Sequence, residues 1–174
     1  NIAACIVEPI AGSTGTLVPP KGYLQRLREI CDKHGILLIF DEVITGWGRT
    51  GSSFASHEFG VTPDIMTMAK ATTNGVVPMG VVACRDEIYD AVMDASPMGS
   101  VELFHGYTYS GIPVAVAAAL AVQDIFEKED IFERAKNLAP YFQKGLFSLQ
   151  DLESVENIRG YGMMGGIDMK MKVK

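Results

Sequence analysis

The chain has 174 residues, of which 48% are hydrophobic, enough for the core of one domain or slightly more. Its formal net charge of -6 argues against nucleic acid as a partner and favours a soluble cytoplasmic protein. No continuous apolar run of membrane length is visible, so we expect no membrane partner.

The first part of the chain predicts a strand, a loop and a helix. Residues 2–7 are mostly apolar and predict a buried strand that ends at Glu8, where the next residue is a proline. Residues 11–20 are rich in Gly, Ser, Thr and Pro and predict a loop. Residues 21–34 have apolar side chains at helical spacing, and Gly35 follows as a C-cap. A strand and a helix in this order, before a second strand, are typical of a parallel sheet.

The next two predicted strands each end in charged residues. Residues 36–40 are almost entirely apolar, as a strand buried on both faces requires, and Asp41 and Glu42 follow directly. A second apolar run over residues 64–69 ends in Lys70. Because open α/β sheets bind ligands at the carboxyl ends of their strands, neighbouring strands would place an acid and an amine over one crevice.

An aspartate and a lysine in one crevice suit the chemistry of pyridoxal phosphate. A lysine in an apolar pocket loses part of the stabilisation of its ammonium form, so its neutral amine can form a Schiff base. A carboxylate at the pyridine nitrogen keeps that nitrogen protonated, and the ring then accepts electrons. Taken alone, an aspartate and a lysine about thirty residues apart are more often two surface charges.

The rest of the chain alternates between helix and strand patterns. The predicted elements are a strand over 79–84, a helix over 85–93, helices over 113–127 and 130–149, and strands over 155–160 and 164–169. Together with the earlier elements, they predict an α/β fold with a mostly parallel sheet and flanking helices.

Five motifs follow one another in the sequence: VEPIAGSTG, DEVITGWGRTG, PDIMTMAKATTNG, LFHGYTYSG and RGYGMMGGID. In this order they resemble motifs of the class III aminotransferases, which are pyridoxal phosphate enzymes of fold type I. They extend along almost the whole chain and are most similar to the ω-amino-acid:pyruvate (β-alanine:pyruvate) subgroup. Ser13 supports this subgroup, because many other relatives have a glutamate at the matching position.

The resemblance implies roles for individual residues. Lys70 would be the catalytic lysine that holds pyridoxal 5'-phosphate as a Schiff base, and Asp41 would bind the ring nitrogen. Val43 would pack against the ring, and Thr108 would bind the phosphate of a cofactor held by the neighbouring subunit. Glu8, at a strand end, would reach the cofactor pocket or, equally well, accept a hydrogen bond in the following loop.

The resemblance also implies how the protein is organised. Residues 1–128 would be part of the large cofactor-binding domain, and residues 129–174 would begin a smaller α+β domain. The active protein would be a homodimer or a higher oligomer with shared active sites. The family's glycine-rich phosphate loop and its substrate-binding arginine have no match in this sequence, so we expect an internal fragment of a longer enzyme.

Two further residues near the central motifs leave alternatives open. Arg49, in a glycine-rich loop, is compatible with a phosphate contact, but a salt bridge within the loop is the commoner arrangement. Ala71 follows Lys70 where relatives usually have glycine, and it would be strained if the backbone there required a positive φ. No cluster of His, Cys, Asp or Glu has metal-ligand spacing, so we predict no metal.

The implied reaction is a ping-pong transamination. An ω-amino acid or amine, such as β-alanine, would give its amino group to a keto acid, with pyruvate as the expected acceptor, and Lys70 would act as general base and acid. The alternatives are an isomerase similar to glutamate-semialdehyde aminomutase, a decarboxylase of related fold, and a folded scaffold without activity.

Overall fold

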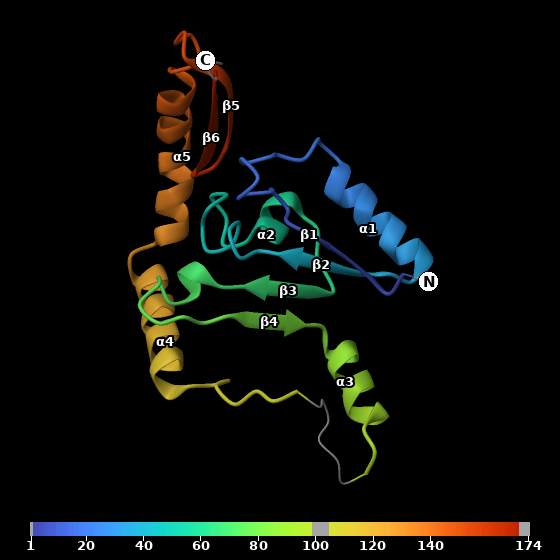
Figure 1. Cartoon of the computed structure of the whole chain (residues 1–174). Coiled ribbons are helices and arrows are strands. Elements are labelled where there is room, and N and C mark those ends of the chain that lie inside the picture. The colour runs from blue at the N-terminus through green and yellow to red at the C-terminus, as the bar shows by residue number, and fades with distance from the viewer. Residues whose placement is uncertain (1, 99–104, 171–174) are drawn as a thin grey trace.

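The computed structural model of the chain describes residues 2–98 and 105–170 (Figure 1). Leu103 and Phe104, which begin the LFHGYTYSG motif, lie outside the described residues. The elements are, in chain order, β1 (Ala4–Val7), α1 (Tyr23–His34), β2 (Leu37–Asp41), α2 (Ala55–Phe59), β3 (Ile65–Met68), the short 3-10 helix η1 (Lys70–Thr72), β4 (Val81–Cys84), α3 (Asp86–Ala95), α4 (Pro113–Lys128), α5 (Ile131–Phe147), β5 (Val155–Tyr161) and β6 (Met164–Met169).

Four strands form one sheet in the order β1-β2-β3-β4. The first three strands are parallel, and β4 is antiparallel to β3. The register pairs Val7 with Phe40 and Phe40 with Met66, so the carboxyl ends of β1, β2 and β3 meet at one edge. The predicted α/β fold with a mostly parallel sheet is therefore confirmed.

One face of this sheet packs against α1. Leu24 and Cys31 of α1 contact a buried cluster that includes Leu38 and Phe40 of β2. The helix ends as predicted at Gly35, which has a left-handed backbone with φ 62°. Helix α1 therefore forms the crossover between the parallel strands β1 and β2.

The opposite face of the sheet is open within the described residues. Alternate strand residues point to this face, and among them Ile6 is 62% exposed and Val82 is 69% exposed. Leu37 at the start of β2 is also exposed, whereas Leu38 is fully buried. The expectation that residues 36–40 are buried on both faces is therefore wrong for this chain, because only the α1 side is covered.

Helices α4 and α5 follow one another along one side of the molecule, and the β5–β6 hairpin lies beside α5 (Figure 1). Helix α4 starts at the predicted Pro113, and the rings of Phe126 and Phe132 meet at 5.3 Å where α4 and α5 join. No helix in the described ranges is long and apolar enough to cross a membrane.

The turn of the β5–β6 hairpin packs directly on the loop that follows β2. Gly162 in this turn has φ 56°, and a Cβ atom there would lie 2.6 Å from the carbonyl oxygen of Arg49. The N–H of Met163 donates a hydrogen bond to the same oxygen at 2.8 Å. A glycine is needed at this position, both for its backbone conformation and because the two segments approach so closely.

Candidate active site

A pocket of about 410 Å³ lies where the parallel strands end. Ser13 comes from the loop after β1, Val43 and Arg49 from the loop after β2, and Lys70 from the turn after β3. Met163, from the turn between β5 and β6, also lines the pocket. The sheet thus brings four distant segments of the chain to the edge at which open α/β folds bind ligands.

Lys70 is the first residue of η1, lines the pocket and is exposed to solvent. Its φ is 49°, a left-handed conformation that is uncommon for a lysine. Among the described residues after it, the next positive φ is at Asn74. Ala71 therefore does not have a positive φ, and the alanine that replaces the usual glycine is not strained. The strain lies at the lysine itself.

Asp41 ends β2 and is half-buried. Its Oδ1 accepts hydrogen bonds from the N–H of Val43 at 3.0 Å and from the hydroxyl of Thr67 at 3.3 Å. Oδ2 has no partner within the described part of the chain, so it can accept a hydrogen bond from a ligand. Asp41 is not itself among the residues that line the Lys70 pocket, but Val43, which holds its carboxylate, is.

Glu42, the neighbouring carboxylate, has a structural role. It is fully buried, and its oxygens accept hydrogen bonds from the hydroxyl of Thr45 and from the N–H groups of Ala55 and Ser56 at 2.7–2.8 Å. These bonds hold the first turn of α2 against the end of β2. Consecutive residues of a strand point to opposite faces, which separates the two carboxylates that the sequence places side by side.

Glu8 and Thr108 do not line the pocket of Lys70. Glu8 Oε2 accepts a hydrogen bond from the N–H of Gly12 at 2.9 Å and so holds the turn that contributes Gly12 to the pocket wall. Thr108 lines a separate pocket of about 510 Å³, together with His105 and Ser110, just before the N-terminus of α4. Within one chain, the structure therefore does not bring Thr108 to Lys70.

Arg49 occupies the Lys70 pocket without an ion-pair partner among the described residues. The salt bridge within the loop, which we considered the commoner arrangement, is therefore not formed. The sequence gives little sign that the β5–β6 turn reaches Arg49 across more than a hundred residues. The glycine-rich GMMGG stretch was the only local signal. The described ranges contain no group of three or more His, Cys, Asp or Glu residues that could hold a metal ion.

Comparison with known proteins gives consistent matches over the whole chain. The family model described as "Aminotransferase class-III" matches residues 1–174. The omega-aminotransferase of Caulobacter vibrioides and the beta-alanine–pyruvate aminotransferase of Pseudomonas aeruginosa are both 56% identical over 170 residues. These matches cover 98% and 97% of this chain, respectively, but only 38% of either relative.

A solved structure agrees with these matches. The amine transaminase of an uncultivated Pseudomonas species, solved in a PLP-bound form, superposes with a TM-score of 0.88 at 44% identity. The match covers 95% of this chain and 37% of that one. The chain thus spans less than two-fifths of the length of each of these three proteins.

Proposed function

The chain belongs to the class-III aminotransferases, and we propose that it forms the central part of an enzyme that transfers an amino group from an ω-amino acid or amine to pyruvate. The observation that carries this proposal is the pocket at the carboxyl ends of β1, β2 and β3, which both Lys70 and Val43 line. The names of the relatives from Caulobacter vibrioides and Pseudomonas aeruginosa support the donor class and the acceptor.

Pyridoxal 5'-phosphate is the cofactor of the proposed reaction, and it fits the chemistry of Lys70 in the pocket and of Asp41, which is held by the pocket residue Val43. Lys70 supplies an exposed amine, and Asp41 has one carboxylate oxygen fixed and the other without a partner among the described residues. The pocket volume of about 410 Å³ lies in the range of small-molecule sites. When bound, the cofactor supplies an electron sink for bond breaking at the amine-bearing carbon of the donor.

Each of these residues has a defined task in the proposed mechanism. Lys70 would hold the cofactor through its amine, and its Nζ, once free, would take a proton from the amine-bearing carbon of the donor. Asp41 would hold a proton on the ring nitrogen, and its pre-positioned negative charge would need little reorganisation. The N–H of Val43 fixes the Asp41 carboxylate, and its apolar side chain would pack against the ring. Glu8 holds the Gly12 turn at the pocket wall.

We further propose that two subunits share their sites. Thr108 and Ser110 stand just before the N-terminus of α4, where helix N–H groups favour anions, and their pocket is separate from that of Lys70. This arrangement suits a phosphate that belongs to the partner's cofactor. We also place a boundary after residue 128, between a large domain and a smaller one that begins at residue 129, because β5 and β6 form a sheet of their own.

Arg49 is expected to bind the carboxylate of the keto acid. Arg49 lines the Lys70 pocket and has no ion-pair partner in the part of the chain that the structure describes. A guanidinium can form a two-pronged hydrogen bond with a carboxylate, whereas a lysine keeps the charge but loses the fork. Arg49→Met should raise KM for pyruvate about tenfold to hundredfold, and Arg49→Lys by less, because a hydrogen bond to a charged group contributes about 1.5–3 kcal/mol. Steady-state kinetics at varied pyruvate would measure this change.

Arg26→Met is the matched control for Arg49, because Arg26 forms an exposed ion pair with Glu29 on α1 and does not line the pocket. It should leave KM unchanged. An unaltered KM for pyruvate in Arg49→Met would show that the guanidinium does not contact the acceptor.

The proposed function is tested by mixing the protein with pyridoxal phosphate, β-alanine and pyruvate. Alanine should form, and double-reciprocal plots at several fixed donor concentrations should give parallel lines, as a ping-pong mechanism requires. Amine migration within a substrate in the absence of pyruvate would indicate an isomerase instead. Release of carbon dioxide would indicate a decarboxylase, and the absence of any product would contradict the proposed activity for this chain.

A further inference from the structure

The side chain of Trp47 reaches the turn that carries Lys70. Its indole N–H donates a hydrogen bond to Thr72 Oγ1 at 3.1 Å. The same hydroxyl donates to the carbonyl oxygen of Ala69 at 3.0 Å. Ala69 and Thr72 flank Lys70 in the chain, and Thr72 is only 4% exposed. A hydrogen-bonded chain from the indole therefore closes around the lysine.

Trp47 is itself held on several sides. Its backbone N–H donates to the carbonyl oxygen of Ser53 at 2.6 Å, and its own φ is 60°. The indole ring lies 4.9 Å from the ring of Phe54 and 5.8 Å from the ring of Phe126 in α4. The donor that reaches Thr72 is thus fixed by both the loop after β2 and a long helix.

The Lys70 turn needs such support. A non-glycine residue with a φ of 49° is held in place only when the surrounding structure determines its conformation. The hydrogen bonds to the carbonyl oxygen of Lys70 itself are long, 3.4 Å from the N–H of Thr73 and 3.3 Å from the N–H of Gly75. The backbone N–H of Thr72 donates to the carbonyl oxygen of Ala69 at 3.1 Å. The buried hydroxyl of Thr72 adds a second bond to that oxygen at 3.0 Å and accepts the indole N–H, so it ties the Lys70 turn to Trp47.

We propose that Trp47 is a positioning residue, which holds Lys70 through Thr72 in the left-handed conformation that presents its amine to the pocket. This inference rests on the proposed function of Lys70. Trp47 touches neither substrate nor cofactor in this role. It acts by raising the fraction of molecules in which Lys70 has the conformation that presents its amine to the pocket.

Four variants separate the hydrogen bond from simple packing. Trp47→Phe keeps an aromatic ring but removes the N–H, and Thr72→Val removes the hydroxyl at similar volume. Thr72→Ser keeps the hydroxyl and should behave like the unaltered chain. Phe54→Leu reduces the packing against Trp47 without touching the hydrogen bond, and it serves as the matched control.

The first readout needs no cofactor. Trp47 is the single tryptophan of the chain, so its indole N–H gives one identifiable NMR signal. In Thr72→Val this signal should move and its proton should exchange about tenfold faster. In Trp47→Phe the N–H groups of Thr73 and Gly75, which bond to the Lys70 carbonyl, should exchange about tenfold faster. Unchanged exchange in Trp47→Phe overturns the inference.

The second readout is the rate at which borohydride traps pyridoxal phosphate on Lys70, with Lys70→Ala as the baseline. Trp47→Phe and Thr72→Val should each lower this rate about tenfold. The double variant should lower it no further, because each single variant already removes the same Trp47–Thr72 hydrogen bond. Additive losses, or an equal loss in Phe54→Leu, overturn the inference. A wild-type rate no higher than the Lys70→Ala baseline contradicts the proposed function instead, and it reduces Trp47 to a structural contact.

Discussion

Lys70→Ala is expected to form no borohydride-stable adduct with pyridoxal phosphate, whereas the unaltered chain should gain the mass of one cofactor. The reason is the position of Lys70, which is solvent-exposed and lines the pocket at the carboxyl ends of the parallel strands. Intact-mass spectrometry after reduction gives the stoichiometry, and peptide mapping gives the modified residue. Transamination should fall by at least the factor of about 10²–10⁴ that general acid–base catalysis contributes.

Two controls make the Lys70 result specific. Lys136→Ala removes an exposed lysine on α5 whose ammonium lies 3.8 Å from the nearest oxygen of Glu133, and it should leave the adduct unchanged. Adding a small primary amine to Lys70→Ala should restore part of the proton transfer, because the amine can occupy the space of the missing side chain. An undiminished adduct in Lys70→Ala would assign the reactive amine to another lysine.

The features that could be predicted from the sequence depend on local patterns. The apolar runs before Asp41 and Lys70 predicted parallel strands, and β2 and β3 are indeed neighbours in the sheet. Gly35 ends α1 and Pro113 begins α4, because cap residues act over a few neighbouring positions. The motifs predicted the class III family, which the match over the whole chain confirms.

The features that could not be predicted depend on contacts between distant segments. Arg49 was expected to pair within its loop, but it lies in the Lys70 pocket beside Met163, which is more than a hundred residues away. The positive φ falls on Lys70 and not on Ala71, because the hydroxyls and N–H groups of the following residues determine the turn. Neither outcome follows from composition or periodicity, since both depend on the folded arrangement.

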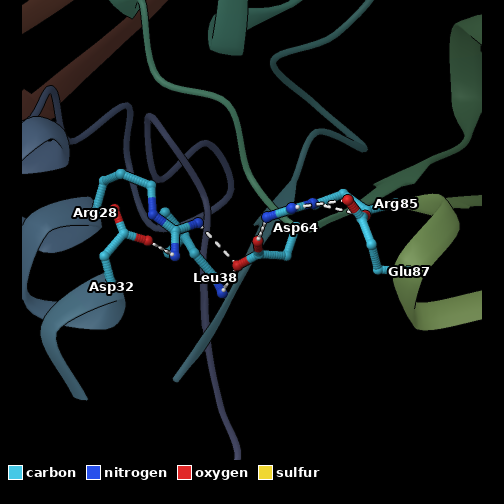
Figure 2. A network of polar contacts seen from close by, with 6 residues as sticks. All are labelled: Arg28, Asp32, Leu38, Asp64, Arg85 and Glu87. Atoms are coloured by element: carbon cyan, nitrogen blue, oxygen red, sulfur yellow. Dashed lines mark hydrogen bonds and ion pairs between the residues drawn. The ribbon is translucent and has the colours of Figure 1, made fainter. Parts of the chain in front are cut away.

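The buried carboxylate of Asp64, which pairs with two arginines, is expected to contribute strongly to the stability of the fold. The Asp64 residue is 5% exposed, and its Oδ2 accepts hydrogen bonds from Arg28 Nη1 at 2.8 Å and from the N–H of Leu38 at 2.7 Å. Its Oδ1 accepts from Arg85 Nη1 at 3.0 Å. Figure 2 shows Asp64 between the two arginines, which come from α1 and from the residue before α3. One carboxylate thus joins α1, β2 and the end of β4.

Asp64→Asn should lower the free energy of unfolding by about 3 kcal/mol, because removing one member of a buried ion pair leaves a poorly compensated charge. The amide keeps an acceptor for Leu38 but points N–H donors at a guanidinium, and Arg28 is left with Asp32 as its ion-pair partner. Urea unfolding should show a lower midpoint at an unchanged slope. Asp32→Asn is the matched control, because Asp32 is the other ion-pair partner of Arg28 and its own side chain is 64% exposed. This variant should lower the free energy of unfolding by less than about 1 kcal/mol.

The contacts of Asp64 also predict how the difference in free energy of unfolding between the unaltered chain and Asp64→Asn depends on pH. Burial by itself would raise the pKa of Asp64, but the hydrogen bonds from the Leu38 N–H, Arg28 and Arg85 outweigh it and hold the pKa below its usual value. A folded-state pKa below the unfolded value of about 3.9 contributes stability that is present above that pH and is lost as the pH falls through the folded value. The stability gap between the unaltered chain and Asp64→Asn should therefore be constant near neutral pH and narrow below about pH 4. A gap that stays the same down to pH 2 would mean that the charge of Asp64 does not stabilise the fold, and that the loss in Asp64→Asn comes from the shape and donors of the amide alone.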